Sequence, residues 1–160
     1  MAIPNDGISV PEEWNQITER IIGSAIEVHS ALGPGLLESL YEEAVVHELR
    51  DRGLSLERQR PIRMRYKGHE IGNLRLDLLV EGLVIVELKC VERIADVHGA
   101  QLLSYLRSAD LPIGLLINFN HTRLTDGITR RLNSHCSLLK SSTSSLRSAP
   151  VTPVPLRSSP

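Results

Sequence analysis

The chain has 160 residues, of which 41% are hydrophobic and 3% aromatic, and its formal net charge is −1. This length predicts a single domain, and the hydrophobic content supports a globular core, so a wholly disordered chain is excluded. The neutral balance argues against a protein that binds nucleic acid by bulk positive charge, and the scarcity of aromatic residues argues against a base-stacking platform.

The charge is distributed unevenly along the chain. Residues 137–160 contain eight serines, four prolines and three basic residues but no acidic residue, a composition that predicts a disordered tail. Residues 1–136 form the predicted domain and carry a net charge of −4. Within it, residues 50–67 hold seven basic residues and two acidic ones. Such a run is either a solvated face or, beside a metal site, a track for phosphate groups.

Apolar residues recur every three or four positions in the first third of the chain, which predicts two helices. The first covers residues 11–32 and ends at the Gly33-Pro34-Gly35 turn, and the second covers residues 36–52 and ends before Gly53.

The pattern then changes to the alternation that is typical of strands with one solvated face. The predicted strands are joined by tight turns and cover residues 62–66, 74–78 and 83–91. A helix over 95–109, a buried strand over 113–119 and a short helix over 125–133 complete the expected order. Antiparallel strands followed by a strand–helix–strand crossover predict an α/β fold with a mixed β-sheet flanked by helices.

Three charged residues interrupt the apolar strands and are the first candidates for a functional site. Glu87 and Lys89 are two residues apart and therefore point to the same face, and the turn at Glu81-Gly82 brings Asp77 back beside them. Charges in central strands are costly unless they are paired or bind a metal. Two close carboxylates suit Mg²⁺ or Mn²⁺, whereas the alternative is a buried salt bridge from Lys89 without any catalysis.

These residues resemble a known family. Asp77 followed by Glu87-Leu88-Lys89 resembles the core motif of the PD-(D/E)XK nuclease superfamily, and Gln101 with Tyr105 is similar to the QxxxY motif of its RecB-like branch. Gly35, Glu38 and Tyr41 are similar to the signature of the small bacterial GxxExxY proteins, which are placed in that superfamily. The resemblance covers residues 17–133, but Leu76 stands where a proline often precedes the motif aspartate.

The resemblance implies a restriction-endonuclease-like core and a metal-dependent nuclease that hydrolyses phosphodiester bonds, for which we expect DNA as the substrate. It implies that Asp77, Glu87 and Glu38 bind the metal ion, Mg²⁺ or Mn²⁺, and that Lys89 is the catalytic lysine. Gln101 and Tyr105 would contact a substrate phosphate or brace Lys89.

Other interpretations stay open at this point. Glu38 can be an acid that stabilises a helix N-terminus, and Tyr41 reads more readily as a core aromatic that packs on the first helix. Arg63 and Arg65 are predicted to contact substrate phosphates if the basic run lies beside the metal site. The alternative function is a catalytically silent nuclease-fold module that binds nucleic acid or a protein partner.

Expectations about location and assembly follow from simple features. No apolar run approaches the roughly 18 residues of a membrane span, and the first ten residues lack signal-peptide features. The two cysteines, Cys90 and Cys136, suggest reduced thiols. We therefore expect a cytoplasmic protein without a membrane partner. A nuclease of this size that cuts both strands could act as a homodimer.

Overall fold

The structure, a computed structural model, describes residues 8–140. Three α-helices, five β-strands and one 3₁₀ helix follow one another within these residues. Their order along the chain is α1 (Glu12–Leu32), α2 (Glu38–Asp51), β1 (Leu56–Tyr66), β2 (His69–Val80), β3 (Val84–Lys89), α3 (Asp96–Ala109), β4 (Ile113–Asn118), η1 (Leu124–Gly127) and β5 (Ile128–Leu132).

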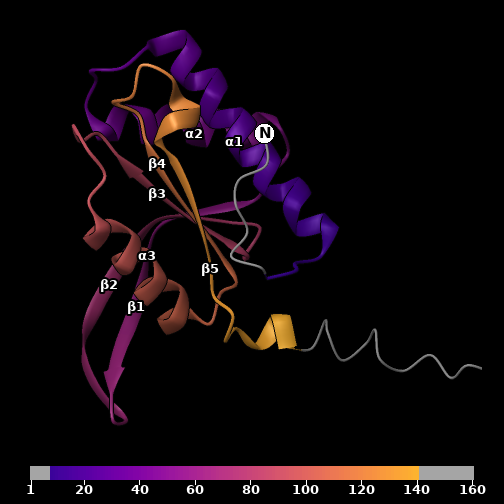
Figure 1. Cartoon of the computed structure of the whole chain (residues 1–160), viewed down its shortest axis with the longest axis vertical. Coiled ribbons are helices and arrows are strands. Elements are labelled where there is room, and N and C mark those ends of the chain that lie inside the picture. The colour runs from indigo at the N-terminus through magenta and orange to yellow at the C-terminus, as the bar shows by residue number, and fades with distance from the viewer. Residues whose placement is uncertain (1–7, 141–160) are drawn as a thin grey trace, which may run out of the picture.

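The strands form one five-stranded sheet in the order β1-β2-β3-β4-β5 (Figure 1). Neighbouring strands are antiparallel except β3 and β4, which are parallel and joined by the α3 crossover. The turn between β2 and β3 has positive φ angles of 53° at Glu81 and 61° at Gly82, and the Leu83 backbone N–H closes it by donating to the Val80 carbonyl over 3.0 Å. Three residues, 81–83, therefore separate the paired residues Val80 and Val84. The predicted mixed sheet flanked by helices is therefore confirmed.

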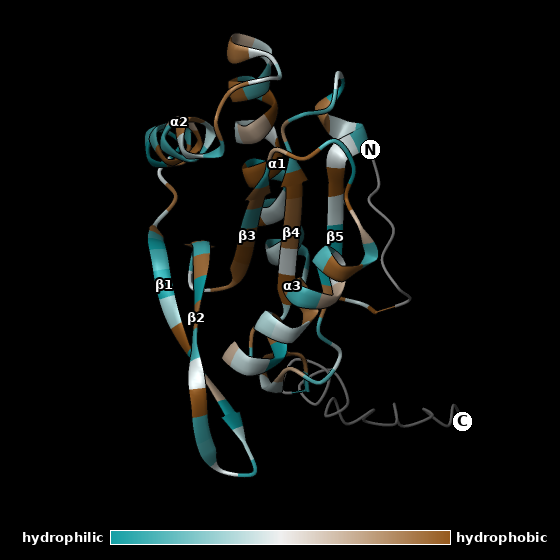
Figure 2. Ribbon diagram, turned by 90° about the vertical axis from the view of Figure 1, so that its left-hand side faces the viewer, coloured by the Kyte–Doolittle hydropathy of each residue, from teal (hydrophilic) through white to brown (hydrophobic). Residues whose placement is uncertain are grey.

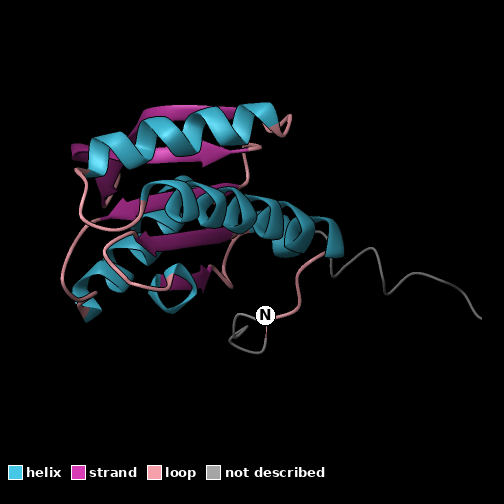
Figure 3. Cartoon of the chain, turned by 90° about the horizontal axis from the view of Figure 1, so that it is seen from above, coloured by secondary structure: helices cyan, strands magenta, loops and turns pink. Residues whose placement is uncertain are grey.

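Two hydrophobic clusters hold the helices to the sheet. One joins α1 and α2 to residues of β3 and β4 such as Val86 and Leu115, and the other joins α3 to Leu76, Ile85 and Leu116. Viewed from above, α1 and α2 run alongside each other (Figure 3). Figure 2 shows β3 and β4 as mostly hydrophobic strands, as expected for strands that are covered on both faces.

The hairpin of β1 and β2 leaves the sheet part of the way along its length. The ladder between β2 and β3 runs from Val80↔Val84 only as far as Leu78↔Val86. Beyond this point β1 and β2 stay paired with each other and extend away from β3, past α3 (Figures 1 and 2). Both strands are longer than predicted because polar residues at the start of β1 (56–60) and at the start of β2 (69–73) hide the alternation in the sequence.

The prediction of a helix over residues 125–133 is wrong. Residues Leu124–Gly127 form a 3₁₀ helix, and Ile128–Leu132 form β5, which pairs with β4. The 3₁₀ helix ends at Gly127, just before β5, and this glycine approaches β4 closely. A Cβ at this position would lie 2.6 Å from the Asn118 backbone oxygen, so only glycine fits. Arg130 is buried within the strand and thereby disguised the apolar alternation.

Only the beginning of the predicted tail, residues 137–140, lies within the described part of the chain. Residues 137–140 form a helical turn in which Leu139 is buried, and the Ser137 backbone N–H donates to Asp110 Oδ1 over 3.0 Å. Residues 141–160 lie outside the described residues. In the described part of the chain, no helix has the length and apolar character that crossing a membrane requires.

Candidate functional site

The carboxylates of Asp77 and Glu87 meet where β2 separates from β3. The Asp77 backbone N–H donates to Glu87 Oε1 over 3.2 Å, and the Leu88 backbone N–H donates to Asp77 Oδ2 over 2.9 Å. Immediately beyond the last ladder pair, two side chains thus accept the hydrogen bonds that strand carbonyls would accept in a continuous sheet. The predicted convergence of these two carboxylates is therefore present.

Burial and mutual repulsion control the protonation of this pair. Glu87 is only 7% exposed, and its burial, followed by the nearby negative charge of Asp77, raises its pKa from 4.5 to about 8. The Asp77 backbone N–H favours the charged form and lowers the Glu87 pKa, the Asp77 carboxyl group raises it again, and the positive charge of Lys89 lowers it. Without a cation, the pair therefore retains a proton at neutral pH.

Lys89 lies two residues beyond Glu87 in β3, at the register position opposite Asn118 of β4. Its charge lowers the pKa values of both Glu38 and Glu87, so all three groups share one electrostatic neighbourhood. Within residues 8–140, Lys89 forms no ion pair with a carboxylate. The buried salt bridge that the alternative interpretation requires is therefore missing.

Glu38, the first residue of α2, faces the same cluster from a separate element. Partial withdrawal from water raises the Glu38 pKa, Lys89 lowers it, and Asp77 raises it again. The backbone N–H of Cys90, the residue after β3, favours the charged form of the Glu38 carboxylate and lowers its pKa. Glu38 is therefore more than an acid at a helix N-terminus, because it interacts electrostatically with Asp77 of β2 and Lys89 of β3.

Tyr41 anchors the start of α2. It is fully buried, its ring stacks on Phe119 with 4.4 Å between the centroids, and its hydroxyl donates to the Gly33 carbonyl. Phe119 in turn donates its backbone N–H to the Lys89 carbonyl over 2.8 Å. The structural interpretation of Tyr41 is confirmed, although its main aromatic contact is Phe119 rather than the first helix. These contacts fix α2 relative to the end of β3.

Gln101 and Tyr105 form a hydrogen-bonded pair on α3. Gln101 Nε2 donates to the Tyr105 hydroxyl oxygen over 2.7 Å. Burial raises the Tyr105 pKa, and the charges of Glu87 and Asp77 raise it further, so the phenol lies within the influence of both carboxylates. A phenol that accepts from Gln101 keeps its own proton available for donation. The structure thus brings the predicted helical pair to the carboxylate site.

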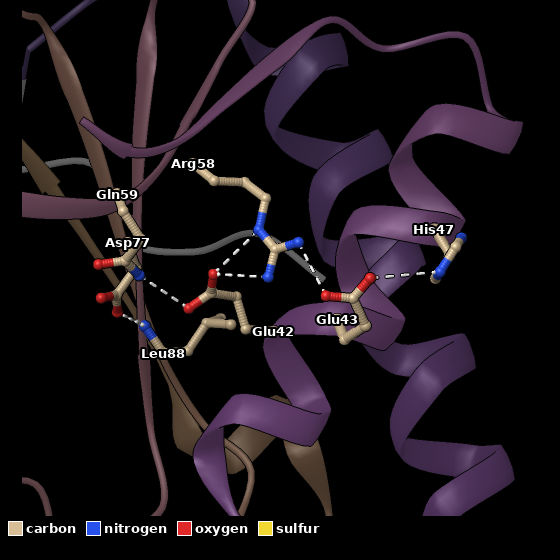
Figure 4. A network of polar contacts seen from close by, with 7 residues as sticks. All are labelled: Glu42, Glu43, His47, Arg58, Gln59, Asp77 and Leu88. Carbon is tan, nitrogen blue, oxygen red and sulfur yellow. Dashed lines mark hydrogen bonds and ion pairs between the residues drawn. The ribbon is translucent and has the colours of Figure 1, made fainter.

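A polar network next to the site was not predicted from the sequence. Gln59 lies opposite Asp77 in the β1–β2 register, but its positive φ of 48° coincides with a missing ladder pair. Its Nε2 donates to Glu42 of α2 over 2.9 Å, and Arg58 pairs with both Glu42 and Glu43 (Figure 4). Glu42 is one helical turn beyond Glu38, so this network joins α2 to the strand beside Asp77.

Arg63 and Arg65 lie apart from the carboxylate cluster. Both belong to the part of the hairpin that has left β3, and both line a groove of about 480 Å³ between the hairpin and the C-terminal end of α3. Leu76 and Leu79 of β2 also line this groove and flank Asp77 along the strand. The arginines therefore occupy a neighbouring surface rather than the site itself.

The donor chemistry at the site suits a hard divalent cation. Asp77, Glu87 and Glu38 offer carboxylate oxygens, and the raised pKa of Glu87 keeps a proton on the buried pair at neutral pH. A cation would replace that proton and relieve the repulsion. The described residues nevertheless contain no group of three or more His, Cys, Asp or Glu side chains already arranged around one metal position. The residues therefore fit a divalent cation by the kind of ligand atoms that they offer.

Comparison with known proteins adds one result. A model of the PD-(D/E)XK nuclease superfamily matches residues 15–131, a span that contains every residue of the carboxylate cluster. Neither the curated proteins nor the solved structures give a match.

Proposed function

Because the chain belongs to the PD-(D/E)XK nuclease superfamily, we propose that it is a metal-dependent nuclease that hydrolyses phosphodiester bonds in DNA. The observation that carries this proposal is the Asp77–Glu87 pair, placed where β2 leaves β3 and joined by reciprocal hydrogen bonds to the backbone. Two carboxylates this close repel each other, and a shared proton or a bound cation relieves that repulsion. A purely structural position would favour apolar residues there.

In this proposal, Asp77, Glu87 and Glu38 hold Mg²⁺ or Mn²⁺. The bound ion supplies positive charge to the phosphate and acidifies water. Lys89 extends from the same face of β3 and orients the attacking water with its ammonium group. The Tyr105 hydroxyl, supported by Gln101, donates a hydrogen bond toward the carboxylates or a phosphate oxygen. Arg63 and Arg65 contact phosphates farther along the substrate.

We also propose that the chain is a GxxExxY protein. Each residue of that signature has a distinct physical role here. Gly35 has a φ of 99°, which favours glycine, Glu38 faces the carboxylate pair, and Tyr41 ties α2 to the core. The spacing of the signature therefore matches a turn at Gly35 followed by the start of α2, which places Glu38 beside β3.

A cleavage assay tests the proposed activity. The full chain would be incubated with linear, circular and single-stranded DNA, with Mg²⁺, with Mn²⁺ or with EDTA. We expect cleavage that depends on the metal and falls by about 100-fold or more in Lys89→Ala and Asp77→Ala. Arg123→Ala, which changes an exposed base outside the site, serves as the matched control.

Two outcomes would contradict the proposal. Cleavage that survives both substitutions would point to a contaminating enzyme. Absence of cleavage on every substrate, with DNA binding retained, would favour the catalytically silent module instead.

A further inference from the structure

The groove beside the site has an unusual lining. Three arginines, Arg60, Arg63 and Arg65, contribute to it, and none of its eleven lining residues is acidic. Arg60 pairs with Glu57 over 2.8 Å and Arg63 lies 3.9 Å from Glu70, whereas Arg65 has no ion pair among the described residues. The groove thus concentrates positive charge on a domain whose overall charge is slightly negative.

The floor of the groove is apolar. Ile62 and Leu79 are buried in the α3-side cluster, and with Leu76 and Leu111 they supply the apolar part of the lining. Ser108, near the end of α3, adds a hydroxyl at the opposite wall. A ligand that suits this groove carries anionic groups along one edge and flat or apolar groups along the other.

The dimensions of the groove restrict the form of nucleic acid that it can hold. Its volume of about 480 Å³ is that of a small-ligand site. A B-form duplex, whose major groove alone is about 12 Å wide, can touch only the rim with its outer phosphates. An unpaired strand can place phosphates on the arginines and turn bases toward the apolar floor, where guanidinium planes can stack on them.

We propose that this groove binds a single-stranded segment of the DNA substrate. The inference rests on the proposed nuclease function and adds the form of the substrate and one further binding residue, Arg60. Leu76 and Leu79 lie within two residues of Asp77 along β2, a distance of about 7 Å at the rise of a β-strand. A DNA strand bound in the groove therefore passes next to the carboxylate pair. No aromatic side chain lines the groove, so contacts with the phosphate backbone carry most of the binding.

Binding without cleavage tests this proposal. Fluorescence anisotropy in EDTA would compare a labelled 20-nucleotide oligothymidine, which forms no duplex, with a 20-base-pair duplex, over a range of NaCl concentrations. We expect the full chain to prefer the single strand. In Arg63→Ala/Arg65→Ala we expect single-strand affinity to fall at least about tenfold. Loss of two phosphate contacts would reduce the salt slope by about 1.4.

The control must remove the same charge elsewhere. Arg50 and Arg123 are exposed bases outside the groove, so Arg50→Ala/Arg123→Ala is expected to keep single-strand affinity within about twofold. Arg60→Ala is expected to weaken the single-strand complex and leave the weaker duplex binding unchanged. Circular dichroism would verify the fold of each variant.

Failure of this proposal can be distinguished from failure of the nuclease proposal. Equal binding of both oligonucleotides, equal losses in the two double variants, or equally tight binding of a polyglutamate peptide would overturn the groove assignment, whatever the cleavage assay gives. Arginine-dependent single-strand binding by Lys89→Ala would support the groove even if no cleavage were found.

Discussion

The parallel strands β3 and β4 are six residues long, lie side by side and differ sharply in charge. Glu87 of β3 is in register with Leu116 of β4, and Lys89 is in register with Asn118. The difference lies in their other neighbours. β4 is paired with β5 up to Ile117, whereas β3 loses β2 after Val86. Charged side chains are thus tolerated in β3 where its pairing with β2 ends, because backbone N–H groups there donate to the carboxylates.

Asn118 shows what β4 uses at the corresponding position. Its Oδ1 accepts from the Val91 backbone N–H over 3.1 Å, and its Nδ2 donates to the Val91 carbonyl over 2.8 Å. A neutral amide therefore holds the segment that leaves β3, directly beside Lys89. β4 supports the backbone of the site, and β3 supplies its charges.

The largest effect on stability is expected at Leu116, in the α3-side core. Leu116→Ala leaves a cavity opposite Glu87 and should lower the free energy of unfolding by about 2–5 kcal/mol. Urea denaturation measures this change, with Val97→Ala as an exposed control that should change it by less than about 0.5 kcal/mol. A loss below about 1 kcal/mol would contradict the structural role assigned to β4.

A smaller effect is expected at Asn118. Asn118→Ala leaves both polar groups of the Val91 backbone without their partner and should cost about 1–3 kcal/mol. Because the same segment follows Lys89, cleavage should fall as well, but less than in Lys89→Ala. Denaturation and the cleavage assay measure the two effects, and Asn120→Ala, at an exposed neighbour, should alter neither.

The smallest effect near pH 4.5, and the one with a distinctive pH dependence, is expected for Glu87→Gln. The folded-state pKa of about 8 lies above the ordinary value of 4.5, so between these pH values the folded chain holds a proton that the unfolded chain has released. This contribution to stability is complete below about pH 4.5 and is lost as the pH rises through about 8.

Glu87→Gln removes this pH dependence while keeping an oxygen acceptor for the Asp77 backbone N–H. In metal-free solution the variant should therefore match the parent near pH 4.5 and increasingly exceed its stability as the pH rises towards 8. Thermal unfolding across this pH range measures the difference. Parallel pH profiles for the two proteins would contradict the raised pKa.

The sequence predicted most elements because their periodicity is strong. The spacing from Glu12 to Leu32 and the continuous apolar run of β4 could be interpreted directly. β5 escaped prediction because Arg130 occupies a buried position in its alternation, where its guanidinium donates to Asn15 of α1 over 2.9 Å. That contact depends on packing between residues 115 positions apart, which no local pattern contains.

The candidate site divides along the same line. The turn at Glu81-Gly82 made the approach of Asp77 to Glu87 predictable, because a tight turn returns the next strand alongside the first. The register, with three residues between Val80 and Val84, places Asp77 opposite Glu87. The Gln59–Glu42 contact was not predictable, since it requires a left-handed residue in a strand and a helix placed against it. The position of Arg63 in a separate groove follows from the bend of the hairpin, which the alternation does not encode.

Calorimetric titration of the metal-free full chain with Mn²⁺ at pH 7 tests the central claim most directly. In two buffers that differ in ionisation enthalpy, we predict one binding event that releases close to one proton, because Glu87 with a pKa of about 8 must lose its proton to coordinate the ion. Asp77→Asn should abolish this event, and Val97→Ala should retain it. Absence of binding by the parent chain, or unchanged binding by Asp77→Asn, would contradict a metal site at the Asp77–Glu87 pair.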